Sequence, residues 1–505
     1  MLAGENAARL FVVSEASSFF ARAIEVARRM PAEKVSEAQL RELYQQRGRA
    51  LELDGQFDAA MENYRELESL ARQRSSLSLE LAALTSQAIV HVIPSVQFDP
   101  WRSQEIAARI QDLLQQVHDP ALEARALWTL GLLESRIGLN NERALEYGQQ
   151  AEAIARRHDL KEQLAYTLHD LSRTYMEVGR IEDAWEAHEE SKALWRELGN
   201  LPMLADSLGT GAQGLYLMGR YQPGIELSEE GIRVSRQAAS LWGEAYCLMG
   251  LGHIYLETGE IEKSLQALDR AQKLGEQANF LAPVFSARVL LAWVYAQLGD
   301  PMRGLEIMEQ VRRDSRTRVA DAGYISAVNS VLYLYADNLA RVEKAFAQIA
   351  SAEEASSRAD AFFGPLFTYF RAELAFRRGD YQNALDLTQM GLEERRRSHA
   401  RIFLVDYYEL QGRALLELGR LQEARRAFEK AHQECLETGS RRLLWKVLFG
   451  QARACTALGD EQGAQALRRE ASGEVRRLSA SIGRPDLKQA FEQIPEVREL
   501  LSTAA

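Results

Sequence analysis

The sequence predicts an all-α protein, a solenoid of about twelve helical hairpins, and three observations lead to this prediction. Only 11 of the 505 residues are prolines, and Ala, Leu, Glu, Gln and Arg, which favour helices, are abundant. No segment carries strand signals. Glycine recurs at a stride of forty residues, with only the position near Leu339 skipped: Gly179, Gly219, Gly259, Gly299, Gly379, Gly419 and Gly459. Such a stride indicates one structural unit copied many times.

Composition narrows the class of protein. A hydrophobic content of 46% with 26% charged residues is typical of an ordered core. The net charge of −11 gives no support to a nucleic-acid or anionic-membrane partner. The three cysteines, Cys247, Cys435 and Cys455, are too far apart in sequence for a disulfide framework or a metal-ligand pair, which indicates a reducing compartment.

The chain also lacks membrane and secretion signals. Glu5, Arg9 and Glu15 interrupt the apolar positions of the first twenty residues, so this segment is no secretory signal. The longest apolar run, 289–298, has half of the roughly 20 residues that a membrane-spanning helix needs. We expect a soluble cytoplasmic protein.

Each unit carries small or apolar residues at fixed distances from its turn glycine. Seven residues before the glycine stand Gly48, Gly131, Ser172, Ala212, Gly252, Ala292, Ala372, Gly412 and Ala452. Five residues after it stand Ala60, Ala184, Gly224, Ser264, Gly304, Ala384, Ala424 and Ala464. Four before it is usually a larger apolar residue, as at Leu51, Tyr175, Leu215, Tyr255, Tyr295 and Leu415. Small side chains let two helices cross closely.

These positions predict a hairpin of a first and a second helix, joined at the glycine by a left-handed cap. Acids and amides in segments such as 55–60, 179–184 and 419–424 suit the first turn of the second helix, where the helix dipole favours them. A lone hairpin cannot bury its apolar stripe, so neighbouring hairpins must stack.

The sequence predicts the connections between hairpins less clearly than it predicts the hairpins. Asp119, Asp159 and Asn279 fall on the same stride, and we expect each to cap the next first helix. The pattern is weak at 75–117, which contains Pro94 and Asp99-Pro100-Trp101, and at 320–350, where no glycine marks the turn. Hairpins with irregular connections are expected there. We predict that 1–469 form the array and 470–505 form capping helices.

The small, apolar and glycine positions resemble the tetratricopeptide repeat (TPR) over nearly the whole chain, although the usual TPR period is shorter, at 34 residues. The resemblance implies a right-handed superhelix. The longer period is similar to the sensor region of large bacterial signal-transduction ATPases, including maltose-regulator-like activators and ATPase-linked nucleotide cyclases. Residues 6–29 resemble the first repeat of such regions, and residues 470–501 resemble their closing helices.

The chain departs from that family in what it lacks. No Gly-Lys dipeptide occurs, so there is no Walker A loop for phosphate, and no DNA-reading or cyclase domain is recognised. The resemblance therefore leads us to expect either a separated sensor region or a protein that carries only that region.

Motifs for catalysis or cofactors are weak. Gly209-Thr-Gly211-Ala-Gln-Gly214 spells a dinucleotide fingerprint, but it falls within a predicted helix, where glycines allow a close approach, and not after a strand. The His-Asp pairs at 118–119, 158–159 and 169–170 are better explained by capping than by a metal phosphohydrolase. We predict no cofactor, no metal site and no catalytic residue.

A ligand-binding groove is predicted on the inner surface, where the first helices of TPR arrays line the concave side. We define the inner-face positions as those ten and six residues before each turn. Ten before stand Trp128, His169, Met249, Asn329, Tyr369 and Phe449. Six before stand Arg173, Gln213, His253, Trp293, Tyr333, Glu373, Arg413 and Arg453. Aromatic and arginine anchors are frequent in binding hot spots.

For each of these residues, packing between adjacent repeats is an equal alternative to a ligand role. The stretch from His253 through Glu373 is the strongest candidate. Few lysines occupy these positions, which argues against the clamp by which co-chaperones hold acidic tails.

Two functions from different classes remain. The leading hypothesis is a non-catalytic sensor whose groove binds a protein or peptide partner, or a small-molecule inducer, and regulates an attached or associated signalling ATPase. The alternative is a constitutive protein-interaction scaffold. An enzyme is a third class with no supporting motif, and the sequence leaves the ligand and the oligomeric state open.

Overall fold

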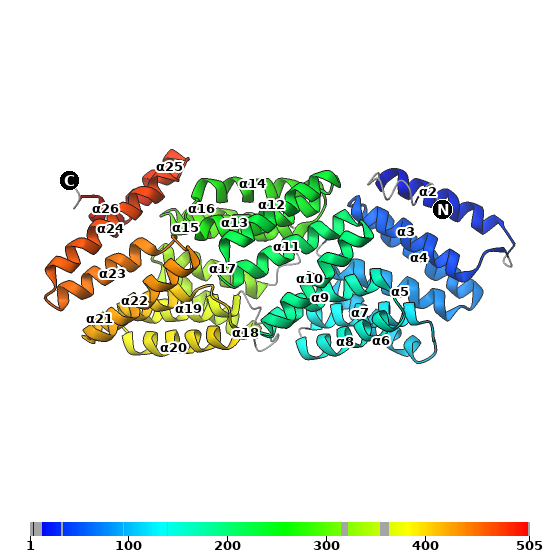
Figure 1. Cartoon of the computed structure of the whole chain (residues 1–505), viewed down its shortest axis with the longest axis horizontal. Coiled ribbons are helices and arrows are strands. Elements are labelled where there is room, and N and C mark those ends of the chain that lie inside the picture. The colour runs from blue at the N-terminus through cyan, green and yellow to red at the C-terminus, as the bar shows by residue number, and fades with distance from the viewer. Residues whose placement is uncertain are drawn as a thin grey trace. The chain divides into compact units, whose positions relative to one another are not determined.

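A computed structural model describes residue 4 and residues 13–31, 34–93, 95–138, 140–314, 322–353 and 363–502. Within these ranges it has 25 α-helices, one π-helical turn and no strand, labelled in Figure 1. The predicted all-α class is therefore confirmed. None of the helices described is both long and apolar enough to cross a bilayer.

The first part of the chain contains the helices α2 (Val13–Arg29), α3 (Glu37–Leu53), α4 (Phe57–Arg74), α5 (Leu77–Val92), α6 (Pro100–Leu114), α7 (Pro120–Leu133), the π-helical turn η2 (Glu134–Gly138), α8 (Asn141–Arg157), α9 (Lys161–Glu177), α10 (Ile181–Leu198), α11 (Leu201–Leu217), α12 (Tyr221–Gln237) and α13 (Leu241–Glu257).

The remainder contains α14 (Ile261–Gln277), α15 (Leu281–Gln297), α16 (Pro301–Arg313), α17 (Ala322–Tyr335), α18 (Leu339–Glu353), α19 (Phe363–Arg377), α20 (Tyr381–Ser398), α21 (Leu404–Glu417), α22 (Leu421–Thr438), α23 (Leu444–Ala457), α24 (Glu461–Ala480), α25 (Pro485–Glu492) and α26 (Pro495–Ser502). From α3 onward the odd-numbered helices up to α23 are the first helices of hairpins, and the even-numbered helices up to α24 are the second helices.

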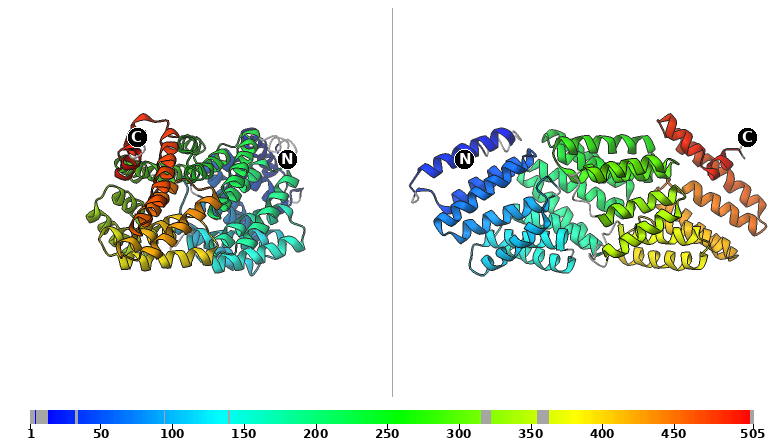
Figure 2. Two further views of the ribbon diagram at one scale, coloured as in Figure 1. Left: turned by 60° about the vertical axis from the view of Figure 1, so that its left-hand side comes forward. Right: turned by 180° about the vertical axis from the view of Figure 1, so that it is seen from behind.

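The described chain packs as two compact units. Unit 1 comprises 1–211, 229–247 and 273–284, and unit 2 comprises 212–228, 248–272 and 285–505. In unit 1, α2 lies beside α3, as the views from the front and from behind both show (Figures 1 and 2). The predicted boundary between array and capping helices at residue 470 stays a prediction.

The hairpin formed by α9 and α10 shows how the sequence makes each unit. Gly179 has φ +79, the left-handed conformation that glycine adopts without strain. The N–H of Gly179 donates to the carbonyl of Met176 at 3.1 Å, and the N–H of Arg180 donates to Tyr175 at 2.8 Å. This pair of bonds is a Schellman cap. It ends the first helix and reverses the chain.

The small residues lie where the two helices of a hairpin cross, as predicted. Ala184 is fully buried, and so are the alanines at the equivalent place in other hairpins. At Gly48 an added Cβ would lie 2.2 Å from the Tyr64 ring, and at Gly412 it would lie 2.7 Å from the Phe428 ring. Any larger side chain would force the helices apart.

At the connections between hairpins the structure confirms one predicted cap and corrects two others. Asp119 does cap α7, because its carboxylate accepts from the N–H groups of Ala121 at 2.9 Å and Leu122 at 3.4 Å. The expectation for Asp159 and Asn279 is wrong: both take the left-handed conformation, with φ +52 and +50, at the end of the preceding second helix. Asn and Asp tolerate that conformation better than other side chains with a Cβ.

The two regions with a weak repeat pattern do form hairpins. Between α17 and α18, Asp337 takes the left-handed turn position with φ +53, in place of a glycine. Between α5 and α6 the connection is longer, and Asp99 caps α6 by accepting from the N–H of Arg102 at 3.0 Å, with Pro100 in the first turn. Proline suits that place because the first helical N–H has no partner within the helix.

The glycine-rich segment 209–214 lies inside α11. An added Cβ at Gly209 would lie 2.8 Å from the Tyr246 ring and 3.2 Å from the Cys247 sulfur. The glycine therefore serves close packing of helices, as predicted, and forms no phosphate loop.

Within unit 2, turns of early hairpins pack against the connections of later ones. The Leu217 carbonyl accepts from the N–H of Arg401 at 2.8 Å, and one repeat further the Glu257 carbonyl accepts from Arg441 at 2.7 Å. At the next turn an added Cβ on Gly299 would lie 2.6 Å from the Ala490 carbonyl oxygen of α25. These contacts join segments far apart in the sequence.

The turn at Gly299 supplies a test of this packing. Gly299→Ala and Gly459→Ala both place a Cβ in the left-handed region, at a cost of about 1–2 kcal/mol. Only Gly299→Ala also meets backbone, because nothing lies within 4 Å of the Cβ position at Gly459. We expect Gly299→Ala to lower stability by about 1–3 kcal/mol more, measured by urea denaturation. Equal losses in the two variants would contradict the packing of α25 on this turn.

Candidate functional site

The sequence-predicted site residues all lie on first helices. They are Trp128 on α7, His169 and Arg173 on α9, Gln213 on α11, His253 on α13, Trp293 on α15, Asn329 and Tyr333 on α17, Tyr369 and Glu373 on α19, and Arg413 on α21.

Their exposure divides them into two groups. Buried are Trp128, His169, Trp293, Tyr369 and Glu373. Partly exposed are Arg173, Gln213, His253, Asn329, Tyr333 and Arg413. The side chains of the second group have some solvent exposure, whereas the first group is enclosed by packing.

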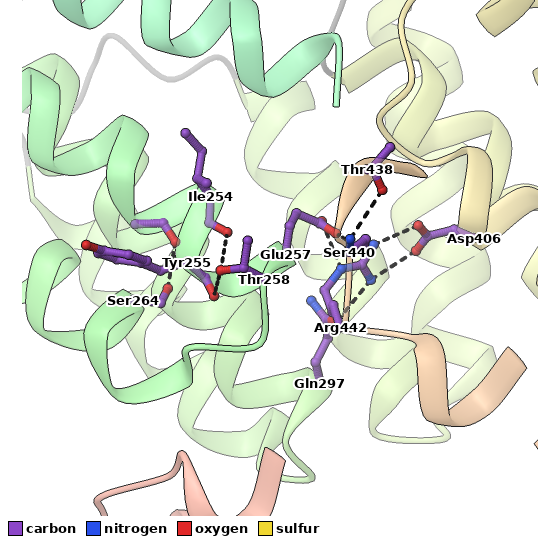
Figure 3. A network of polar contacts seen from close by, with 11 residues as sticks. Ile254, Tyr255, Glu257, Thr258, Ser264, Gln297, Asp406, Thr438, Ser440 and Arg442 are labelled. Carbon is purple, nitrogen blue, oxygen red and sulfur yellow. Dashed lines mark hydrogen bonds and ion pairs between the residues drawn. The ribbon is translucent and has the colours of Figure 1, made fainter. Parts of the chain in front are cut away.

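A buried ion network in unit 2 is centred on Arg442 (Figure 3). Its Nε donates to Glu257 at 2.9 Å, and its Nη1 and Nη2 donate to Asp406 at 3.1 and 2.7 Å. Ser440 Oγ donates to the second Glu257 oxygen at 3.1 Å. All three charged side chains are 5–7% exposed. Burial raises the pKa of Glu257, and the charge of Arg442 opposes that rise.

Trp293 belongs to this network as a packing residue. Its ring lies 5.3 Å from the Arg442 guanidinium and 6.0 Å from the Phe403 ring. A cation over an indole face is stabilised by the charge distribution of the ring. These neighbours support a packing role for Trp293 over a ligand contact.

A second network in unit 2 links Glu373 and Arg413. Arg413 pairs with Glu373 at 2.5 Å and with Glu409 at 3.0 Å, and Arg377 pairs with Glu373 at 3.0 Å. Burial disfavours the charged form of Glu373, but Arg413 and Arg377 outweigh burial and lower its pKa. The charges of this cluster are matched within the fold.

Two further predicted residues of unit 2, His253 and Tyr333, lie beside side chains of neighbouring helices. His253 lies against the Tyr216 ring, with ring centres 5.2 Å apart, and Arg341 lies 5.5 Å from the Tyr333 ring. Gln213, His253, Asn329 and Tyr333 are partly exposed on the first helices of this unit.

Removing Arg442 tests whether its network holds unit 2 together. Arg442→Met leaves two carboxylates buried with no counter-charge, so we expect a loss on the order of 3–5 kcal/mol in thermal unfolding. Without Arg442 the pKa of Glu257 rises further, so the folded variant binds a proton more tightly than the unfolded chain does. The loss should therefore shrink as pH falls from about 8 to about 5.

The matched control is Arg425→Met, which removes one member of a pair with Glu429 whose side chains are both 45% exposed. It should change stability by about 0.5 kcal/mol or less. A similar small effect for Arg442→Met would show that the network is dispensable.

In unit 1 the structure brings the three predicted residues together with two aspartates. Trp128 Nε1 donates to Asp170 at 2.8 Å, and His169 Nε2 lies 3.0 Å from an Asp206 oxygen. Burial opposes the charge of Asp206, yet His169 and Arg173 lower its pKa below the usual value. The adjacent hollow, lined by Arg136, Asp170 and Arg173 among others, has a volume of about 10 Å³, room for one water.

The inner-face positions leave out residues that lie one helical turn earlier on the same face of each first helix. Thirteen residues before the turn, on the same helix face, stand Arg125, Tyr166, Asp206 and Asp406. The rule also applies to the first turn at Gly55, where it selects Gln45 and Arg49. A three-residue step along the same face would have found the first group from sequence alone.

Three of these added residues, Arg49, Arg125 and Tyr166, form a cluster with Trp128 in unit 1. Arg49 lies 5.4 Å from the Tyr166 ring, and Arg125 lies 5.8 Å from the Trp128 ring. The Trp128 and Tyr166 rings are 5.3 Å apart. Arg49 pairs with Glu162 at 2.5 Å. We call Arg49, Arg125, Trp128 and Tyr166 the arginine–aromatic cluster.

Sequence reasoning also missed Arg442, for which a weak signal exists. In the forty-residue stride it stands between Ile402 and Ile482, which are 2% and 4% exposed. A charged residue at a repeat position that is otherwise apolar and buried indicates a specific role for that residue. Its partners come from other hairpins, which no local pattern identifies.

A larger hollow of about 630 Å³ lies on α4, α5, α6 and the connection 95–99. Its lining is polar and includes Arg72, which pairs with Glu68, and Arg102, which pairs with Glu105. Pockets for small molecules are usually mostly apolar. Among the described residues, no group of three or more His, Cys, Asp or Glu side chains is placed to hold a metal ion.

His188 in α10 provides a pH test of the core of unit 1. It is 3% exposed, the nearest carboxylate oxygen, from Glu189, is 4.0 Å away, and burial, Lys192 and His169 lower its pKa to about 3. The unfolded chain binds a proton near pH 6.5, so the folded state loses about 2 kcal/mol between about pH 7 and pH 5.

His188→Leu should remove that part of the pH dependence, measured by denaturation at both pH values. His158→Leu is the control, because His158 is exposed. A pH dependence unchanged in His188→Leu would contradict the neutral, buried state of this ring.

Comparisons with known proteins agree with the fold. The family model of the tetratricopeptide repeat matches residues 42–74, 245–276 and 405–432, and a second tetratricopeptide repeat model matches 286–310. No curated protein matches the sequence.

Three solved structures are similar. A Rap protein complexed with Competence and Sporulation Factor is 14% identical, with 71% of this chain and 98% of that chain covered and a TM-score of 0.55. The apo form of RapI is 16% identical, with 71% and 98% covered and a TM-score of 0.47. NprR in complex with its cognate peptide NprX is 14% identical, with 67% and 98% covered and a TM-score of 0.46. The matched repeats and the helical hairpins identify the fold as a TPR-type array.

Proposed function

We propose that this chain is a non-catalytic binding module whose first helices bind an extended segment of a partner protein or a peptide. One observation carries the proposal: the inner-face positions include both partly exposed polar side chains and buried aromatic rings. In unit 2 the partly exposed side chains include His253, Asn329 and Tyr333, and in unit 1 they include Arg173. Aromatic and arginine anchors within a polar surround are what protein interfaces use.

An extended segment suits these surfaces better than an enclosed small molecule. The hollow beside Trp128 has room for only one water, and the larger hollow on α4 to α6 is polar with paired charges. The Rap protein of similar fold was solved in complex with Competence and Sporulation Factor. That precedent supports a binding role for a fold of this kind.

The finer proposal is that binding regulates an attached or associated signalling ATPase. Its support is the resemblance of residues 6–29 and 470–501 to the ends of sensor regions in such ATPases. A ligand shifts an equilibrium only when it binds two states with different affinity. Regulation therefore requires that the peptide prefer one arrangement of the repeats.

A constitutive scaffold is the second candidate. The matched ion networks around Arg442 and Glu373 favour it, because fully paired buried charges tend to specify one arrangement. A stable partner whose affinity does not change with any peptide or small molecule would support this role.

Selection of random dodecapeptides displayed on phage, with the full chain immobilised, tests peptide binding. Peptides that are enriched should bind in fluorescence polarisation, and Tyr333→Ala or Arg173→Ala should weaken one or more of them by at least about tenfold. The control is Trp101→Ala, which removes a ring that is 79% exposed at the start of α6, outside the inner-face positions. No enriched peptide, or equal effects of all three variants, would contradict the proposal.

A further inference from the structure

The polar hollow on α4, α5 and α6 lies where the repeat pattern of unit 1 is interrupted. In a regular hairpin such as α9 and α10, only residues 178–180 separate the helices, whereas 93–99 lie between α5 and α6. The hollow beside this longer connection measures about 630 Å³, within the range of roughly 300–1,000 Å³ that is typical of small-ligand pockets. None of the inner-face residues belongs to its described lining.

Hydrogen bonds hold the connection 95–99 against α5 and α4. Nδ1 of His91 donates to the Gln97 carbonyl at 2.9 Å, and the N–H of Asp99 donates to the His91 carbonyl at 3.0 Å. The side-chain amide of Gln97 donates to Asp58 of α4 at 2.5 Å. His91 lines the hollow and is only 6% exposed. This wall of the hollow is therefore fixed by the fold of unit 1.

Three arginines line the hollow, Arg65 and Arg72 from α4 and Arg102 from α6. Arg65 pairs with Glu62 at 3.9 Å, and Arg102 pairs with Glu105 at 2.6 Å. In both pairs the two side chains are more than half exposed and come from the same helix, and neither glutamate lines the hollow. Exposed pairs of this kind contribute little to stability, so a ligand can draw these guanidinium groups away at little cost.

The two carboxylates in the lining already have donors. Glu68 accepts from Arg72 and, at 2.9 Å, from the side-chain amide of Gln87. Asp99 accepts from the N–H of Arg102 at 3.0 Å. Burial opposes the charge of Glu68, yet the hydrogen bonds from Gln87 and Arg72 and the charge of Arg102 lower its pKa. With three guanidinium groups against two carboxylates, the lining favours an anion.

A phosphate group fits this lining better than an apolar ligand or a single carboxylate does. A guanidinium presents a planar fork of donors that matches phosphate oxygens. A phosphate monoester has three terminal acceptor oxygens and about two negative charges, so several guanidinium groups can donate to it at once. Val96 and Phe98, which also line the hollow, supply apolar surface for the rest of a ligand.

We propose that this hollow binds a phosphorylated small molecule, whose phosphate groups are held by Arg65, Arg72 and Arg102. The inference goes beyond the proposed function, because it gives unit 1 a second ligand away from the inner-face positions. Neither proposal depends on the other.

Isothermal titration calorimetry of the full chain with ADP, sodium pyrophosphate and adenosine tests the site. Pyrophosphate carries phosphate groups alone, and adenosine carries the uncharged part alone. Sodium sulfate at equal ionic strength, about 50 mM, controls for non-specific attraction of anions. We expect ADP, pyrophosphate or both to bind at least about tenfold more tightly than sulfate and adenosine do. If neither binds more tightly than sulfate, or if adenosine binds as tightly as ADP, the proposal is wrong.

Substitutions in the lining should act in opposite directions. Arg65→Gln and Arg102→Gln should each weaken the binding of that anion by at least about tenfold, because each removes a charged donor. Glu68→Gln should strengthen it, because it removes a negative charge from the lining and keeps the shape of the side chain. A variant that merely damaged the fold would not bind the anion more tightly.

The matched control is Arg109→Gln, which removes the same charge from α6 outside the hollow. Arg109 is 44% exposed and pairs with Glu80 of α5, and its variant should bind the anion like the unaltered chain. Equal losses in Arg109→Gln and Arg102→Gln would indicate attraction to the charge of α6 in general and would contradict the site. Weaker binding by Glu68→Gln would contradict it as well.

Discussion

Close crossing of the two helices in each hairpin is the constraint on which the rest of the structure depends. At Gly48 and Gly412 there is no room even for a Cβ, and Ala184 and Ala424, at the other crossing position, are fully buried. Because the crossing lies at a fixed distance from the turn, it fixes which side of each first helix faces the second helix. The opposite side then recurs at fixed offsets along the chain, and this regularity makes a set of inner-face positions possible.

Buried charge distinguishes the two units. In unit 2, Arg442 and Arg413 are each paired with two carboxylates, so their charges are neutralised within the fold. In unit 1, no ion pair joins Arg125 to a described carboxylate, although Glu52 acts on its charge. A buried charge needs compensation, so the direct ion pairs of Arg442 and Arg413 stabilise the packing of unit 2. Residue type alone does not make this distinction, because all three are arginines on or next to first helices.

The repeat pattern predicts most of the fold, and the binding residues that it selects stay a prediction. Turn glycines and small crossing residues are local features, so the hairpins follow from sequence. Asp159 and Asn279 were assigned to the wrong helix end because the residues that cap helix starts also tolerate the left-handed conformation. The positions of Trp128 and Arg173 followed from the stride, but Arg125 lies one turn further along. The partners of Arg442 come from distant hairpins, and no local pattern encodes that packing.

The most direct test of binding by the first helices is photo-crosslinking of a selected dodecapeptide. A benzoylphenylalanine at Asn329, on the inner face of α17, should crosslink the peptide. The same group at Met390, which is 60% exposed on the second helix α20, should not. Crosslinking confined to Asn329 is the result expected for a peptide bound along the first helices. Equal crosslinking at both positions, or crosslinking at Met390 alone, would contradict it.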